Sequence, residues 1–255
     1  MTKNIRLICF NTIREIMRDK IFFGLLAFAL IYLISIVFIS SISLGQDIRI
    51  TKDLGLAGIY LYSTIISIYY GTTALSREFE RKTYLTVISR PVSVLELILG
   101  KFFGLFTIIA ANIFLVNILY IVILLAKNGD VDYLSLVQSL ILAFEAATLI
   151  SVAFLLSTRF SELTTIILTT ILLFIGHNLT ILKKATVGAF FLLNWLANAI
   201  YYIFPNLEKF NFRNTIVYGQ IPSASQIILP ILYSIVFSAL LLSLTNLSIK
   251  KQAEN

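Results

Sequence analysis

Six long apolar runs dominate this chain of 255 residues and constrain its fold more than any other feature. A run of about 20 residues, at about 1.5 Å per residue in a helix, covers the roughly 30 Å hydrocarbon core of a bilayer. The runs are too long and too uniformly apolar for the alternating strands of a membrane barrel. The sequence therefore predicts an all-α polytopic membrane protein with these six spans: Ile21–Ser43, Leu54–Leu75, Phe102–Ala126, Leu134–Ser157, Leu163–Leu182 and Gln226–Leu247.

Composition agrees, because 58% of the residues are hydrophobic and only 13% are charged. A soluble domain of this size could not bury so much apolar surface. Nothing resembling a linker or a low-complexity stretch divides the chain, so residues 1–255 are expected to form a single membrane domain.

The distribution of Lys and Arg predicts the orientation. Seven of the 20 basic residues, Arg49, Lys52, Lys127, Lys183, Lys184, Lys209 and Arg213, flank the spans on one side. The other thirteen lie on the opposite side, and cytoplasmic loops carry the excess of Lys and Arg. Both termini are therefore expected in the cytoplasm, with the chain in a prokaryotic cell membrane. The same placement explains the net charge of +7 by membrane orientation, so nucleic acid is not an expected partner.

The uncharged segment Ala185–Phe204 is long enough to be a seventh span. An odd number of spans would place Lys250 and Lys251 outside, against the orientation rule. We therefore expect re-entrant or interfacial helices within an extracytoplasmic loop, residues 183–225, since non-helical backbone is tolerated at membrane depth where protein covers it.

The N-terminal segment, residues 1–20, is amphipathic. Its apolar residues recur at three- and four-residue steps, with Lys3, Arg6, Arg14 and Arg18 on another face. This pattern is typical of a basic helix that lies on membrane lipid headgroups. The alternative is a signal peptide, but the following apolar run exceeds the 7–15 residues of such a segment and no cleavage site follows.

The segment Ser76–Lys101, between the second and third spans, is unusual for a connection. It begins with a dense group of charges of both signs and is interrupted at Arg90-Pro91, where proline disfavours helix in the preceding residue. Val92–Leu99 can form a short helix before Gly100 and Lys101 return the chain to the membrane. A simple solvated loop would be about 4–6 residues long, so we expect a small rigid cytoplasmic unit that transmits motion from a soluble partner.

The residues of this segment resemble the ABC-2 family of ABC transporter permeases. The likeness rests on Arg77-Glu78-Phe79-Glu80-Arg81-Lys82-Thr83, Ser89-Arg90-Pro91-Val92-Ser93, Gly100-Lys101 and, before the last span, Pro205-Asn206-Leu207-Glu208. The chain departs from the family pattern at Lys82, often glycine, and at Val94, often basic.

The resemblance implies a homodimer or heterodimer of permease chains joined to two ATP-binding cassette subunits, which bind ATP and Mg²⁺. The segment would be the coupling helix that sits in a groove of the ATPase, and the helices after the fifth span would re-enter from outside. The residues expected to contact the ATPase are Arg77, Glu78, Glu80, Arg81, Thr83, Arg90, Pro91, Val92 and Ser93.

The chain itself is expected to contain no active site, cofactor or metal. A phosphate-binding loop needs G-x-x-x-x-G-K-[ST], but Gly100-Lys101 is followed by Phe102. With one cysteine, Cys9, and one histidine, His177, no disulfide, thiolate cluster or multi-histidine site can form.

Glu145, near the middle of the fourth span, is the one carboxylate deep in an apolar run, and Gln138 and Thr148 share its helix face. Intramembrane carboxylates usually face the bundle interior or a cavity. These three residues are therefore candidates for a substrate pathway or gate. The alternative is a protonated or hydrogen-bonded packing residue. Asn112 and Asn117 are expected to form hydrogen bonds between helices.

The leading hypothesis is a permease subunit of an ABC exporter. The second keeps the ATPase but has the chain transmit motion through residues 183–225 to an extracytoplasmic partner. The third, an intramembrane enzyme or ion-coupled carrier, is disfavoured because such a carrier is expected to hold several intramembrane charges.

Overall fold

The computed structural model describes residues 2–42, 47–80, 93–127, 130–185 and 191–254, and in this part of the chain it is all-helical. The element order is α1 (Thr2–Ile16), α2 (Lys20–Ser41), α3 (Asp47–Glu80), α5 (Val94–Ala126), α6 (Tyr133–Ser157), α7 (Glu162–Ala185), α8 (Phe191–Ile203), the 3₁₀ turn η1 (Leu207–Phe210), α9 (Arg213–Val217) and α10 (Ala224–Glu254).

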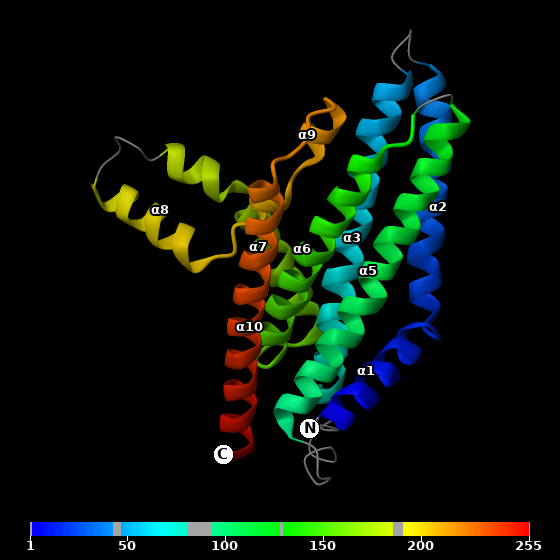
Figure 1. Ribbon diagram of the computed structural model, residues 1–255. Coiled ribbons are helices and arrows are strands. Elements are labelled where there is room, and N and C mark those ends of the chain that lie inside the picture. The colour runs from blue at the N-terminus through cyan, green and yellow to red at the C-terminus, as the bar shows by residue number, and fades with distance from the viewer. Residues whose placement is uncertain (1, 43–46, 81–92, 128–129, 186–190, 255) are drawn as a thin grey trace.

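Six of these helices, α2, α3, α5, α6, α7 and α10, are long and apolar enough to cross a membrane, which confirms the predicted spans. The spans lie side by side in one bundle, with both termini at the same end, as an even number of crossings requires (Figure 1). We call this the terminal end and the opposite one the distal end. The centre of the bundle is α6, where 78% of the apolar stretch is buried, against 22% for α2.

The N-terminal helix α1 crosses the terminal end of the bundle at an angle to the spans and packs on α5 (Figure 1). Two glycines of α5 allow this approach. A Cβ at Gly100 would lie 2.6 Å from Cβ of Ile8, and one at Gly104 would lie 2.8 Å from the carbonyl oxygen of Cys9. The predicted apolar face of α1 therefore packs inward, although Met17, which continues its spacing just past the end of the helix, is 54% exposed.

The start of α5 differs from the sequence expectation. Instead of a short helix over 92–99 that ends at Gly100, α5 begins at Val94 and continues unbroken to Ala126. Gly100 does not end the helix because its lack of a side chain serves the packing of α1. Lys101 likewise lies inside the helix, with its ammonium turned toward α3.

The two asparagines of the third span form the expected contacts between helices. Tyr62 of α3 donates a hydrogen bond to Oδ1 of Asn112 at 3.3 Å, and Asn117 donates to the carbonyl oxygen of Ser135 in α6 at 3.3 Å. All four residues are buried, so these bonds satisfy polar groups inside the bundle.

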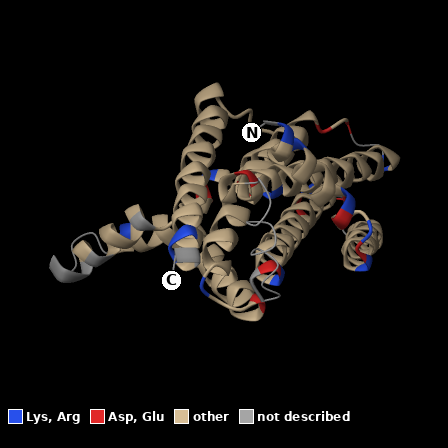
Figure 2. Ribbon diagram, turned by 90° about the horizontal axis from the view of Figure 1, so that it is seen from below, with Lys and Arg blue, Asp and Glu red and all other residues tan. Residues whose placement is uncertain are grey.

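The distal end explains why the span count stays at six. Helix α8 has 13 residues, about 20 Å at 1.5 Å per residue, which is too short for the roughly 30 Å hydrocarbon core. With the end of α7 it forms a hairpin that projects sideways from the bundle in both views (Figures 1 and 2). The following turn, η1, contacts α6 and α7 instead, with Leu207 and Phe210 fully buried.

Candidate functional site

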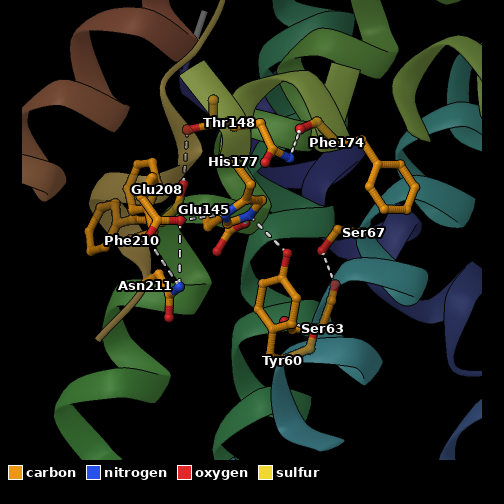
Figure 3. Close-up of polar contacts among 12 residues, drawn as sticks. Tyr60, Ser63, Ser67, Glu145, Thr148, Phe174, His177, Glu208, Phe210 and Asn211 are labelled. Carbon is orange, nitrogen blue, oxygen red and sulfur yellow. Dashed lines mark hydrogen bonds and ion pairs between the residues drawn. The ribbon is translucent and has the colours of Figure 1, made fainter. Parts of the chain in front are cut away.

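A cluster of polar side chains lies inside the distal half of the bundle, centred on His177 of α7 (Figure 3). Its Nε2 is 3.0 Å from Oε1 of Glu145 in α6 and 2.8 Å from the hydroxyl of Tyr60 in α3. Its Nδ1 is 3.3 Å from Oε2 of Glu208 in η1, to which Asn211 also donates. Tyr60, Glu145, His177, Glu208 and Asn211, which we call the distal cluster, thus join three spans to the segment that follows α8.

Close packing of η1 against α7 brings Glu208 to this depth. A Cβ at Gly176 would lie 2.7 Å from the carbonyl oxygen of Pro205 and 2.9 Å from Leu207. A larger residue at position 176 would therefore push η1 away from α7 and move Glu208 from the histidine beside it. Tyr233 of α10 fixes the same segment from the other side, through a 2.9 Å bond from the backbone N–H of Asn206 to its hydroxyl.

The three α6 residues predicted as a pathway or gate are all buried, but they contact three different partners. Glu145 contacts His177, whereas Gln138 donates to the carbonyl oxygen of Phe210 and accepts from the backbone N–H of Phe212. Thr148 donates to the hydroxyl of Ser234 in α10 at 3.0 Å. Gln138 and Thr148 therefore tie neighbouring elements to α6, and Glu145 is the member that belongs to the distal cluster.

The geometry of the cluster defines what it can do chemically. When both are ionised, Glu145 and Glu208 only accept hydrogen bonds, and in that state the imidazole can serve the two together only with a proton on each of its nitrogens. The second oxygen of Glu145, Oε2, is buried and has no hydrogen-bond partner among the described residues. No group of three His, Cys, Asp or Glu side chains in that part of the chain has the geometry of a metal site.

Two cavities meet at the cluster. One, of about 550 Å³, is an apolar groove between α3 and α7, lined by Tyr60, Leu61, Thr64, Ile65, Ile68, Tyr69, Ile166, Thr170, Leu173, Phe174 and His177. The other, of about 510 Å³, is a polar cavity lined by Tyr60, Gln138, His177, Asn178, Thr180, Ile181, Lys184, Glu208, Asn211 and Arg213. Tyr60 and His177 belong to both.

A second set of polar contacts ties the spans at the terminal end. The ammonium of Lys101 in α5 lies 2.6 Å from Oε1 of Glu78 and 2.6 Å from the carbonyl oxygen of Ala74, both in α3. Arg77 lies 3.6 Å from Glu162 of α7 and donates to the hydroxyl of Tyr69 at 3.1 Å. Two residues of the predicted coupling segment, Arg77 and Glu78, thus hold α3 to its neighbours.

The beginning of α5 is fixed in the same region by a reciprocal cap. Ser93 accepts a hydrogen bond from the backbone N–H of Glu96, whose carboxylate accepts from the N–H of Ser93. This capping box defines the first turn of a helix. Asn4 of α1 donates to the same carboxylate at 3.3 Å, which joins the N-terminal helix to the point where α5 begins. We call these contacts, with those of Arg77, Glu78 and Lys101, the terminal-end network.

For the other residues expected to contact an ATPase, the structure describes no side chain. Arg81, Thr83, Arg90, Pro91 and Val92 lie outside the described residues. Glu80 ends α3, and its side chain is likewise not described.

The partners of Glu145 were not predicted from the sequence. His177 lies near the outer end of the fifth span, where a lone histidine favours an interface residue, and Glu208 appeared only within the Pro205-Asn206-Leu207-Glu208 stretch. One signal was available: an intramembrane carboxylate needs a partner, and the chain has a single histidine. The identity of the polar residue that meets Glu145 depends on how α7 and η1 pack against α6, which the sequence does not show.

Comparison of the chain with known protein families found no family that matches, and comparison with the curated proteins found no matching relative. The fold therefore defines the class by itself: this is a multi-pass, all-helical membrane protein with six spans.

Proposed function

We propose that the chain is the permease subunit of an ABC exporter, which forms a substrate pathway as a dimer and is driven by a separate ATP-binding cassette subunit. The observation that carries this proposal is the terminal-end network. It joins α1, α3, α5 and α7 near the end of α3 and the beginning of α5, the two helices that residues 81–92 connect in the sequence. Displacement of that segment by a soluble partner would therefore act on several spans together.

The cavities supply the second line of support. A pathway for hydrophobic or amphipathic substrates needs an apolar surface that is accessible within the membrane, and the groove between α3 and α7 offers one of about 550 Å³. Pockets of about 300–1,000 Å³ are typical of small-molecule sites. We assign this groove to the pathway.

The test pairs the chain with an ATP-binding cassette subunit, to be sought among the neighbouring reading frames. We expect the two to co-purify, and Arg90→Glu to weaken their binding about tenfold or more, because like charges at an interface cost several kcal/mol. Lys250→Glu is the matched control, since it reverses an exposed charge at the same end of the bundle but outside the segment. Equal ATPase binding and hydrolysis with Arg90→Glu and the wild-type chain would contradict the proposal.

The proposed orientation places the terminal end in the cytoplasm. Single cysteines at Gln220 and Lys251 would test it in a Cys9→Ser background, with a maleimide that does not cross membranes. Because Cys9 is the one cysteine of the sequence, this background contains no thiol other than the introduced one. We expect labelling of intact cells at position 220 and labelling at 251 only after lysis, and the reverse pattern would invert the topology.

A second function, transmission of motion to an extracytoplasmic partner, is favoured by the surface of the distal segments. Large apolar side chains are exposed there: Trp195, Tyr202, Tyr218 and Ile221 are 58–83% exposed. Replacing Trp195 and Tyr202 with serine separates the two functions. Transport into vesicles would persist in a permease, whereas loss of the cellular phenotype with unchanged ATPase activity would favour transmission.

A further inference from the structure

The apolar groove and the polar cavity follow one another along α7. From Ile166 to His177 the helix lines the groove, and from His177 to Lys184 it lines the cavity. At about 1.5 Å per residue these stretches are about 16 Å and 10 Å long. Because the two hollows share Tyr60 and His177, a molecule longer than either could occupy both by passing these two side chains.

The chemistry of the lining changes at that point. Toward the terminal end the groove is lined by aliphatic and aromatic residues such as Leu61, Ile65 and Phe174, which offer a ligand only apolar contacts. Toward the distal end the cavity presents a carboxylate, an amide and an ammonium, from Glu208, Asn211 and Lys184. Arg213 also lines it but is already paired with Asp53 at 2.9 Å.

We propose that the groove and the cavity together form one binding site for a single-chain zwitterionic amphiphile. Its tail lies between α3 and α7, and its head occupies the polar cavity, with the cationic group toward Glu208 and the anionic group toward Lys184. Tyr60 and His177 stand at the junction of head and tail. As a statement about the transported substrate this inference rests on the proposed function, but binding itself needs neither ATP nor a partner subunit.

Depth and charge favour this occupant over a second copy of the chain. The polar part of the site lies toward the distal end of α7 and the apolar part toward the middle of the bundle, the arrangement of a lipid in the leaflet on that side. The polar cavity carries both signs of charge, which match a zwitterion better than a purely anionic or cationic head. The apolar helix face of a second copy would offer no charged group to Lys184.

The experiment uses the purified full-length chain in nanodiscs and two photoreactive probes with the same tail. One probe carries a phosphocholine head and the other an uncharged maltoside head. We expect the phosphocholine probe to label Leu61, Ile65 and Phe174. Leu61→Trp, which fills the groove, should abolish this labelling, whereas Ile118→Trp, on the exposed face of α5, should leave it unchanged.

Head recognition is tested with Lys184→Gln, an exposed position whose replacement is not expected to disturb folding. Binding of the phosphocholine probe should weaken about tenfold, the usual effect of losing a contact to a charged group, while maltoside binding stays the same. Glu208→Gln should act in the same direction, with thermal melting as the check on its fold.

Three results would overturn the proposal: labelling spread evenly over the exposed faces of α5 and α10, equal loss of both probes with Lys184→Gln, or cross-links from the groove to a second copy that exclude the probe. Failure of the ATPase to bind would instead contradict the proposed function, and the result for probe binding to the chain alone would still stand.

Discussion

The ion pair of Arg77 in the terminal-end network and that of Glu145 in the distal cluster differ in depth, and therefore in what they contribute. In the terminal-end network the side chains of Arg77 and Glu162 are 43% and 28% exposed, so water screens their attraction. In the distal cluster the side chain of Glu145 is 3% exposed, and that of His177 is 17% exposed. Exposed ion pairs contribute about 0–1 kcal/mol, whereas removing one partner of a buried pair costs about 3–5 kcal/mol.

This difference separates two roles. The contact of Arg77 with Glu162 can be exchanged at little cost, which suits a region that has to move when a partner docks. Disturbing the distal cluster should cost more free energy of unfolding, because Glu145 would then be a carboxylate buried inside the spans without its histidine partner. Variants at the two ends should consequently separate stability from coupling.

The largest effect is expected from His177→Leu, which leaves Glu145 buried without its partner. The free energy of unfolding should fall by about 3–5 kcal/mol, measured by denaturant titration of the purified protein in detergent. Glu145→Gln is the matched variant, since an amide can still hydrogen-bond the ring, and it should lose distinctly less. Equal losses would mean that the ionic character of the pair contributes little.

The second-largest loss of stability is expected from Gly176→Val. Its new side chain meets Pro205 and Leu207 and should cost about 1–3 kcal/mol by overpacking. Gly24→Val is the control, because nothing lies within 4 Å of a Cβ at that position in α2. If the two valines melt alike, the contact of η1 with α7 does not stabilise the distal end.

Lys101→Met tests the most buried contact of the terminal-end network. It removes the donor to the carbonyl oxygen of Ala74 and the partner of Glu78, and should cost about 1–2 kcal/mol. Lys20→Met, at an exposed position of the same end, should leave the melting temperature unchanged. A loss larger than that of His177→Leu would reverse the comparison between the two regions.

Arg77→Gln should have the smallest effect on stability, below about 1 kcal/mol, since its ion pair with Glu162 is partly exposed. Its effect on ATP hydrolysis by the complex should nevertheless exceed that of His177→Leu, because Arg77 belongs to the proposed coupling segment. Unchanged hydrolysis, with stability also unchanged, would remove Arg77 from that segment's function.

Much of the fold could be predicted from the sequence because it follows from local patterns. The six spans and the hydrogen bonds of Asn112 and Asn117 were predicted from run length and the cost of polar groups in lipid. Helical spacing also predicted the apolar face of α1, but not its packing on α5. The even number of spans followed from the placement of Lys and Arg, and the 13-residue α8 is too short to contradict it.

Tertiary structure decided what the sequence pattern left open. Residue spacing could not predict that α5 would continue through Gly100, because the approach of α1, far away in sequence, determines the use of that glycine. The contacts of Glu145 with His177, and of His177 with Glu208, likewise bring together α6, α7 and η1. The sequence by itself determined which segments enter the membrane, since each must be apolar on its own. The polar residues that meet inside depend on how those segments pack, which only the tertiary structure decides.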